Sequence, residues 1–397
     1  MKFGKVGQVA LVSAIALIVA TLFTACGTLT VGFLFVPTNR QTPGQIQVFE
    51  VNSEAGSLRT IPTSPFPSGG RNPIAEAVAS DYLNLYVVNE DDNNIVQFGI
   101  GTDGKLYPQS TINTPGSFPI AVTLNSSHTF LFGVDTLQPI AGCSLSNPCP
   151  GNVFVCPVNS DGSLGTQANN TKVCSAFYPL QLTPSDTSTV LTPTAINLLA
   201  NDSSVYVTAY NPANNKGYIF GYTVNGDGSL SPMNGGLPMS AGKKPAAIAS
   251  DSSSQHLYVA DQFSNQILSY AVQSSSTPLS LQSTIGTGSQ PTSLALFNDQ
   301  NLYVTNSADS NVTFYSVSSG NLTNVATYAS DVNPIAIAVD PRKLGFLYTV
   351  NFLGNSLSGY KINQTDGTLI NTQHTPYASS VQPTAITGVP HNGTATK

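Results

Sequence analysis

Charged side chains are scarce in this chain of 397 residues. They make up 9% of the sequence, against roughly 25% in an average protein, and the formal net charge is −6. A surface with so few charges, most of them negative, does not attract a polyanion, so we expect no nucleic-acid partner. Turns are instead supplied by Ser, Thr, Asn, Gly and Pro, a balance that favours an all-β, secreted protein.

Motifs that usually hold a cofactor or carry catalysis are also missing. The sequence has no phosphate-binding glycine loop, no Gly-x-Ser-x-Gly elbow and no cysteine nucleophile motif. The run Asp91-Asp92-Asn93-Asn94 lacks the spaced alternation of a calcium loop. We therefore expect no cofactor and no bound metal.

What the sequence does contain is one phrase that recurs along most of the chain. In residues 291–317 a Pro and a small apolar run are followed by a turn, by the alternating stretch LYVT at 302–305, and by a third run from Val312. Further copies begin at Pro73, Pro119, Pro193, Pro245 and Pro334. Each run is the length of one short strand, so the recurrence indicates a repeat architecture.

The spacing of the copies fits a propeller. The anchor prolines, with a last one at Pro383, are separated by 46, 74, 52, 46, 43 and 49 residues, and about 40–50 residues is the period of a four-stranded blade. Only the third blade needs an insertion, at about residues 136–185. The outer strand of a blade is expected after each Gly-x-Leu turn, at 104–106, 162–164, 228–230 and 367–369.

The two ends of the repeat region complete each other. PTAITGV, from Pro383, has no second strand after it, and VGFLFVPTN, from Val31, has no anchor before it. Six whole units and one shared unit make seven. The sequence therefore predicts a seven-bladed β-propeller over residues 30–390, whose first blade is closed by N- and C-terminal strands, because a closed ring leaves few exposed sheet edges.

The first residues have the pattern of a targeting segment. Lys2 and Lys5 precede an apolar run, and the sequence FTAC at 23–26 resembles the lipobox of bacterial lipoproteins, with Phe where Leu is more usual. The resemblance implies a signal peptide over 1–25, a lipid on Cys26, a linker over 26–29, and attachment to the membrane of the cell envelope, with Gly27 similar to outer-membrane lipoproteins. A simple signal peptide or an uncleaved anchor are the alternatives. Residues 391–397 are expected to be a tail, and the protein a monomer.

Four more cysteines lie in the long third interval. An even number of clustered cysteines in an exported chain indicates two disulfides, and three pairings of Cys143, Cys149, Cys156 and Cys174 are possible. Cys156 occupies the third-strand position that Tyr270 and Tyr315 fill in other blades, which favours pairing it with Cys174 in the next strand region and Cys143 with Cys149. A zinc site is the other interpretation, but the spacings lack a close cysteine pair.

The second-strand sequences LYVTN at 302–306, LYVVN at 85–89, LYVAD at 257–261 and LYTVN at 347–351 resemble the YVTN family of β-propeller repeats. With the Pro, Asp and Gly-x-Leu spacing, they are also similar to the seven-bladed lactonase family, which includes 6-phosphogluconolactonases. This resemblance implies His, Arg and Glu at the central channel, often with Arg-His just after a blade anchor. Here the residues after the anchors are Ile74, Ile120, Thr194, Ala246, Thr292, Ile335 and Thr384, and the four His lie away from the expected ligand side.

One inner-strand residue breaks the repeat. Three residues after the anchor, six copies carry Val122, Ile196, Ile248, Leu294, Ile337 and Ile386, whereas the second blade carries Glu76. A carboxylate in an aliphatic position should be desolvated, with a raised pKa, so Glu76 is the candidate catalytic residue. A local bulge that turns Glu76 toward water is the alternative interpretation.

Loops on the expected ligand side, after the second strands and before the anchors, supply the candidate binding residues. They carry Arg71, Glu90, Asp91, Asp92, Asp135, Lys243, Lys244, Asp261 and Asp309. Such a mixed rim could bind a polar ligand or could be only a solvated surface. The first functional interpretation is an envelope-anchored, non-catalytic propeller that binds a protein, glycan or small molecule on this face. The alternative is a lactonase that hydrolyses a sugar lactone, with Glu76 as general base and Arg71 or Lys243 stabilising the oxyanion.

Overall fold

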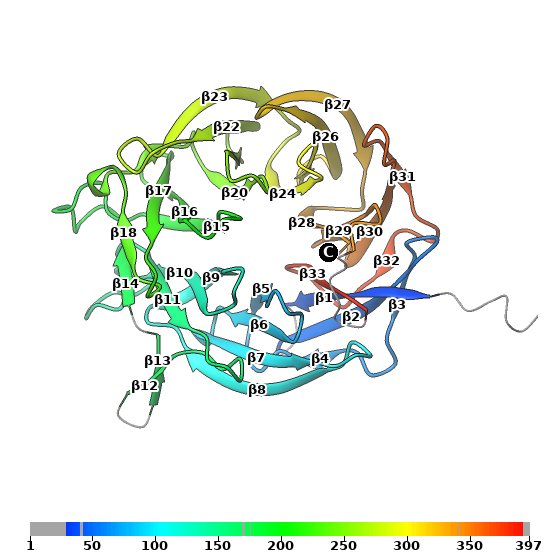
Figure 1. Cartoon of the computed structure of the whole chain (residues 1–397), viewed down its shortest axis with the longest axis horizontal. Coiled ribbons are helices and arrows are strands. Elements are labelled where there is room, and N and C mark those ends of the chain that lie inside the picture. Colours follow the sequence, from blue (N-terminus) through cyan, green and yellow to red (C-terminus); the bar gives the residue numbers. More distant parts are fainter. Residues whose placement is uncertain (1–28, 40–42, 169–170, 175, 341, 392–397) are drawn as a thin grey trace, which may run out of the picture.

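Seven antiparallel sheets surround a central channel in the computed structural model (Figure 1). It describes residues 29–39, 43–168, 171–174, 176–340 and 342–391. The predicted seven-bladed, all-β propeller is confirmed; the helical structure in the described ranges is one 3-10 turn, Asn234–Gly236. No helix in these ranges is long and apolar enough to cross a membrane.

Each blade runs from an inner strand at the channel to an outer strand at the rim. Blades 2, 5 and 6 are regular four-stranded sheets in chain order: β5(Pro73–Val78), β6(Asn84–Asn89), β7(Asn94–Ile100) and β8(Leu106–Asn113); β20(Pro245–Ser250), β21(His256–Asp261), β22(Gln266–Val272) and β23(Leu279–Gly286); β24(Pro291–Phe297), β25(Asn301–Asn306), β26(Asn311–Ser318) and β27(Asn321–Ala329).

Blades 4 and 7 have a divided outer strand, because two short strands pair in turn with the third strand. Their strands are β15(Thr192–Leu198), β16(Ser204–Asn211), β17(Lys216–Val224), β18(Leu230–Pro232) and β19(Met239–Ser240); β28(Pro334–Val339), β29(Phe346–Asn351), β30(Ser356–Ile362), β31(Leu369–Asn371) and β32(Tyr377–Ala378).

Blade 1 joins the two ends of the repeat region, as predicted. Its inner strand, β33(Thr387–Pro390), pairs with β1(Thr30–Thr38), which continues to β2(Gln45–Asn52), β3(Leu58–Thr60) and β4(Phe66–Pro67). Phe33 lies opposite Val389, and Phe35 lies opposite Thr387. Figure 1 shows the red C-terminal strand beside the blue N-terminal strand. The ring is therefore closed by backbone pairing between residues more than 300 positions apart in the chain.

Blade 3 differs from the prediction at its outer strand. It consists of β9(Ser117–Leu124), β10(Phe130–Leu137), β11(Asn152–Pro157) and β14(Ala176–Pro179). The expectation that the outer strand follows the turn at 162–164 was wrong: the chain there forms the hairpin β12(Thr166–Ala168) and β13(Thr171–Val173). The outer position goes instead to residues 176–179, since the extra hairpin delays the return of the chain to β11.

The repeated phrase builds the core between the blades. Side chains of neighbouring sheets form seven buried apolar clusters in the described part of the chain, one at each seam between blades. The tyrosines of the LYV and LYT sequences are fully buried there, and three of them donate a hydrogen bond to a glycine carbonyl of the next blade: Tyr86 to Gly162, Tyr303 to Gly367 and Tyr348 to Gly56, each at 2.7 Å. The blades are thus joined by apolar contacts and by fixed polar links.

Candidate functional site at the channel mouth

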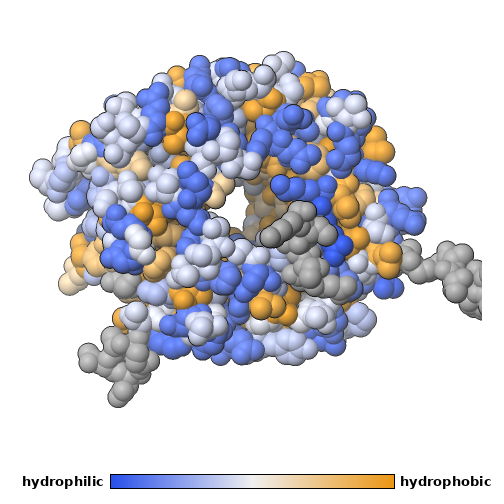
Figure 2. All heavy atoms as spheres, in the orientation of Figure 1, coloured by the Kyte–Doolittle hydropathy of each residue, from blue (hydrophilic) through white to orange (hydrophobic). Residues whose placement is uncertain are grey.

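The channel mouth is defined here as the end of the channel where second strands finish and inner strands begin. In five blades the residue after the second strand donates its N–H to the carbonyl of the residue before the anchor. These pairs are Asn39 to Gln382, Glu90 to Asn72, Gln262 to Lys244, Ser307 to Gln290 and Phe352 to Asn333, at 2.8–3.1 Å. A backbone clamp repeated around the ring holds the mouth side chains in fixed places. Figure 2 shows the central opening with many hydrophilic residues around it.

Only two charged side chains occupy these ring positions in the described chain. Before the anchors stand Asn72, Phe118, Thr192, Lys244, Gln290, Asn333 and Gln382, and one residue beyond the strand partner of each anchor proline stand Asn39, Glu90, Thr136, Tyr210, Gln262, Ser307 and Phe352. The charges, Glu90 and Lys244, belong to blades 2 and 5, which face each other across the channel (Figure 1). The mouth is therefore a largely uncharged polar ring with one carboxylate and one ammonium on opposite sides.

Glu90 has the environment of a proton acceptor. Its carboxylate is half-buried, and Oε2 accepts a hydrogen bond of 2.7 Å from the side-chain amide of Asn72. Burial, and secondarily the negative charge of Asp91, raise the pKa of Glu90 above its usual value. A carboxylate with a raised pKa is a stronger base, which suits it to take a proton from water.

Arg71, Asp91 and Asp92 form a group of their own beside Glu90. The Arg71 guanidinium binds Asp92 at 2.6 Å and the carbonyl of Asp91 at 3.1 Å, and the backbone N–H of Arg71 donates to Asp92 at 2.7 Å. The Arg71 hydrogen bonds lower the pKa of Asp92. Because its guanidinium is already paired, Arg71 is poorly placed to stabilise an oxyanion.

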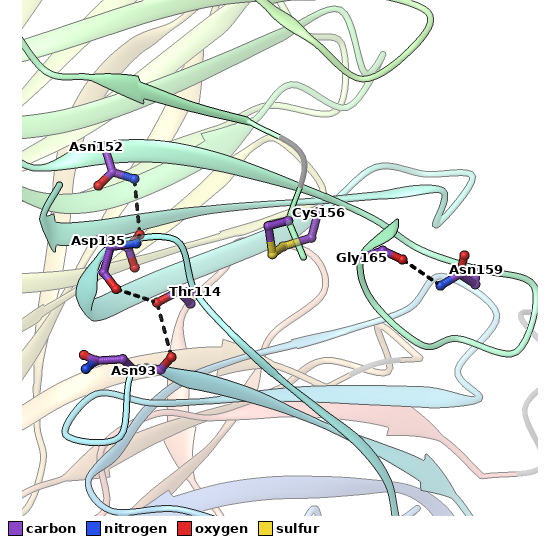
Figure 3. Close-up of a disulfide and its surroundings, with 9 residues drawn as sticks. Asn93, Thr114, Asp135, Asn152, Cys156, Asn159 and Gly165 are labelled. Atoms are coloured by element: carbon purple, nitrogen blue, oxygen red, sulfur yellow. Dashed lines mark hydrogen bonds between the residues drawn. A yellow bond between two sulfur atoms is a disulfide. The ribbon is translucent and has the colours of Figure 1, made fainter. Parts of the chain in front are cut away.

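Asp135 and Asp261 are buried within the sheets. The carboxylate of Asp261 accepts backbone N–H bonds from Lys243 and Lys244, at 3.0 and 2.9 Å, and so fixes the loop before the anchor. Asp135 receives the N–H of Gly116 at 2.9 Å and the amide of Asn152 at 3.2 Å. Burial raises the pKa of Asp135 to about 6, opposed by these bonds and by the Thr114 hydroxyl (Figure 3).

The same position at the end of β6, β25 and β29 is filled by a buried Asn, namely Asn89, Asn306 and Asn351. The side-chain oxygen of Asn306, for example, accepts a hydrogen bond of 2.9 Å from the Thr287 hydroxyl in the preceding loop. Asp135 and Asp261 therefore share a structural role with neutral residues. Among the other predicted binding residues, Lys243 and Asp309 are exposed, and Asp309 accepts the N–H of Ser289 at 2.6 Å.

Glu76 lies in the seam between blades 1 and 2. Glu76 lies opposite Val87 of the second strand, just as Ile248 lies opposite Val259 in blade 5, so the two positions are equivalent. The bulge after Pro73 is also present after Pro245 and other anchors. Both carboxyl oxygens are buried and have no hydrogen-bond partner in the described residues. Burial raises the pKa of Glu76 well above its usual range, and the backbone N–H of Thr387 opposes this without reversing it. A carboxyl sealed from water in this way is poorly placed to activate a water molecule.

Two of the histidines stand next to second strands, and both lie far from the mouth. His128 and His256 stand at the opposite end of the second strands, beside Asp81 at 3.4 Å and Asp251 at 2.7 Å. No group of three or more His, Cys, Asp or Glu side chains in the described residues could hold a metal ion. The mouth chemistry thus falls to Glu90 and Lys244, which sequence reasoning grouped with other rim charges and which only the ring positions single out.

Both favoured disulfides are present in blade 3. Cys143 is bonded to Cys149 in the loop before β11, and Cys156 is bonded to Cys174. Figure 3 shows the second bond further along the same strand from Asn152. Cys26, the predicted signal peptide and residues 392–397 of the predicted tail lie outside the described residues.

Comparisons with known proteins agree with this geometry. Residues 201–339 match the family model for the lactonase, 7-bladed beta-propeller. A periplasmic gluconolactonase from Pseudomonas aeruginosa is 19% identical, with a TM-score of 0.75 over 91% of this chain and 99% of that one. A 6-phosphogluconolactonase candidate from Bacteroides fragilis is 16% identical, with a TM-score of 0.72 over 91% and 99%. None of the curated proteins matches the chain. The chain is thus a seven-bladed β-propeller that resembles the lactonase propellers in fold and, over residues 201–339, in sequence.

Proposed function

We propose that this protein hydrolyses the lactone of a sugar acid at the channel mouth, with Glu90 as the general base. The observation that carries the proposal is the half-buried Glu90 carboxylate, whose pKa is raised and whose position is set by Asn72 and the backbone clamp. The likeness to lactonase propellers supports the same chemistry. Glu90 takes the general-base role that was expected of Glu76.

The reaction needs one proton acceptor and one water molecule. Glu90 removes a proton from water as the oxygen attacks the lactone carbonyl carbon. The bond from that carbon to the ring oxygen then breaks, and the ring oxygen takes the proton that Glu90 accepted, which makes a hydroxyl group and restores the carboxylate. The product is an open-chain hydroxy acid, which releases a proton and remains as a carboxylate at neutral pH.

Hydrolysis of a panel of sugar lactones by the purified protein tests the proposal. Glu90→Gln should lower kcat/KM by about 100-fold or more, the usual size of a general-base effect. Glu54→Gln, at an exposed turn of blade 1, is the matched control and should leave the rate unchanged. The rate should fall with decreasing pH as Glu90 is protonated, with a midpoint above 4.5. Absence of turnover, or a fully active Glu90→Gln variant, would reject the assignment.

A second candidate, binding of a sugar ligand without turnover, is favoured by a different observation. The residues that follow the anchors are apolar or threonine, and Arg71 is engaged by Asp92, so the mouth offers few groups for an oxyanion. In that case the protein would bind a sugar derivative at the mouth, and no lactone would be consumed.

The cellular location is a further part of the proposal. Two disulfides favour an oxidising compartment outside the cytoplasm, and the lipobox-like sequence suggests an anchor on Cys26. Labelling of growing cells with a radioactive fatty acid should mark the parent and not Cys26→Ser. A parent protein without label would contradict lipid anchoring.

A further inference from the structure

Both the backbone and the side chain of Lys244 have fixed contacts. Its backbone N–H donates a hydrogen bond of 2.9 Å to the Asp261 carboxylate, and its backbone carbonyl accepts the N–H of Gln262 at 2.8 Å. Its ammonium nitrogen lies 5.3 Å from the ring centroid of Tyr210 in blade 4 and 4.9 Å from that of Phe263 in blade 5. Two aromatic faces attract the cation and restrict where it can be. The ammonium is therefore fixed at the seam between two blades, at the mouth.

The charge on Lys244 is not neutralised by a neighbouring carboxylate. In the described part of the chain Lys244 has no ion pair, whereas Arg71 and Lys105 lie 2.6 Å from Asp92 and Asp103. An ammonium carries three N–H donors, and aromatic rings satisfy its charge without supplying an oxygen acceptor. Donors of this kind remain available to an oxygen atom of a bound anion.

The position of this ammonium relates it to the proposed reaction. It is the only cation among the ring positions at the mouth in the described residues, and Glu90 belongs to blade 2, which faces blade 5 across the channel (Figure 1). Hydrolysis turns a neutral lactone into a carboxylate. A fixed ammonium without an ion pair, the one cation at the described ring positions, distinguishes these two forms by charge.

We propose that Lys244, positioned by Tyr210 and Phe263, forms an anion subsite that binds the carboxylate of a sugar acid. The inference rests on the proposed sugar site at the mouth and adds its ligand class: an acid in preference to its neutral lactone or parent sugar. It also gives the reaction a consequence, because a bound acid occupies the mouth and inhibits hydrolysis as a competitor of the lactone.

Sodium gluconate and glucose are the probes, titrated separately into the purified full chain and followed by calorimetry at low and high salt. Gluconate should bind more tightly than glucose, and added salt should weaken only gluconate. Lys244→Met should weaken gluconate at least 10-fold, which corresponds to about 1.4 kcal/mol. Phe263→Leu should weaken it by a smaller factor, and Lys244→Arg should retain most of the affinity.

Lys216→Met is the matched control, because Lys216 is exposed in the neighbouring blade 4. It should bind gluconate as the parent does. Equal affinity of the parent for gluconate and glucose, unchanged affinity in Lys244→Met, or equal loss in Lys216→Met would overturn the subsite. The proposed reaction fails separately: gluconate binding through Lys244 in a protein that opens no lactone would refute hydrolysis and support the subsite. Turnover that gluconate does not inhibit would refute the subsite and leave hydrolysis in place.

Discussion

Replacing Glu76 by Val should stabilise the protein, and the gain should depend on pH. Val is similar to Glu in volume, and the six equivalent positions carry Val, Ile or Leu. The substitution removes two buried carboxyl oxygens without partners in the described residues, each of which costs about 1–3 kcal/mol when unsatisfied. Even allowing for relaxation around the side chain, we expect the free energy of unfolding to rise by about 2 kcal/mol at low pH.

The gain should be larger at higher pH. Below about pH 4.5, the usual pKa of Glu, the side chain is protonated in both the folded and unfolded chains. Above it the unfolded chain loses this proton while the folded chain keeps it, because burial raises the folded pKa. The parent therefore loses about 1.4 kcal/mol of stability for each pH unit up to the folded pKa, and Glu76→Val does not.

Denaturant unfolding of parent and variant at pH 4, 6 and 8 measures both effects. Glu54→Val, at an exposed turn, is the control and should change stability by less than about 0.5 kcal/mol. The reasoning would be refuted by a Glu76→Val protein no more stable than the parent. A gain that stays constant from pH 4 to pH 8 would show that Glu76 is ionised in the folded protein.

Three further predictions concern how the ring is held together. Tyr303→Phe should lower the free energy of unfolding by about 1–2 kcal/mol, because it leaves the Gly367 carbonyl unpaired. Tyr258→Phe should cost nothing, because the Tyr258 hydroxyl is buried without a partner in the described residues. Equal losses of stability in the two variants on thermal unfolding would contradict this. Deleting residues 383–397 should lower the melting temperature far more than the loss of a tail, since it removes β33 and the 2.6 Å bond from Thr384 to the Pro73 carbonyl; a truncated protein that melts like the parent would disprove closure. Serine in place of Cys156 and Cys174 should cost about 3 kcal/mol, against about 2 kcal/mol for the shorter loop of Cys143 and Cys149, by loop-closure entropy for separations of 18 and 6 residues; the reverse order in denaturant unfolding would argue against it.

The fold could be predicted because the same pattern of strands and turns recurs along most of the sequence. The register of Glu76 against its aliphatic equivalents, the shared first blade and the third-strand position of Cys156 follow from positions within the repeated phrase. The outer strand of blade 3 could not be located, since an inserted hairpin follows no repeat. A periodic pattern therefore predicts the strands that obey it and says little about insertions.

The candidate site was less predictable, because it depends on contacts between blades. Tyr210, Lys244 and Phe263 are separated along the sequence, and nothing in their spacing indicates that the Lys244 ammonium lies against both rings. In the same way Asp261 is the last residue of β21 and Glu90 is the first residue after β6, yet Asp261 turns into the sheet to bind Lys243 and Lys244, and Glu90 lies at the mouth. One residue of difference along a strand reverses the direction of a side chain.

The direct test of the site is a crystal structure of residues 27–397 soaked with gluconate. The account predicts electron density in the channel mouth, with the carboxylate of gluconate within hydrogen-bond distance of the Lys244 ammonium and the rest of the molecule extending toward Glu90. Density at another surface with an empty mouth, or a carboxylate turned away from Lys244, would contradict it.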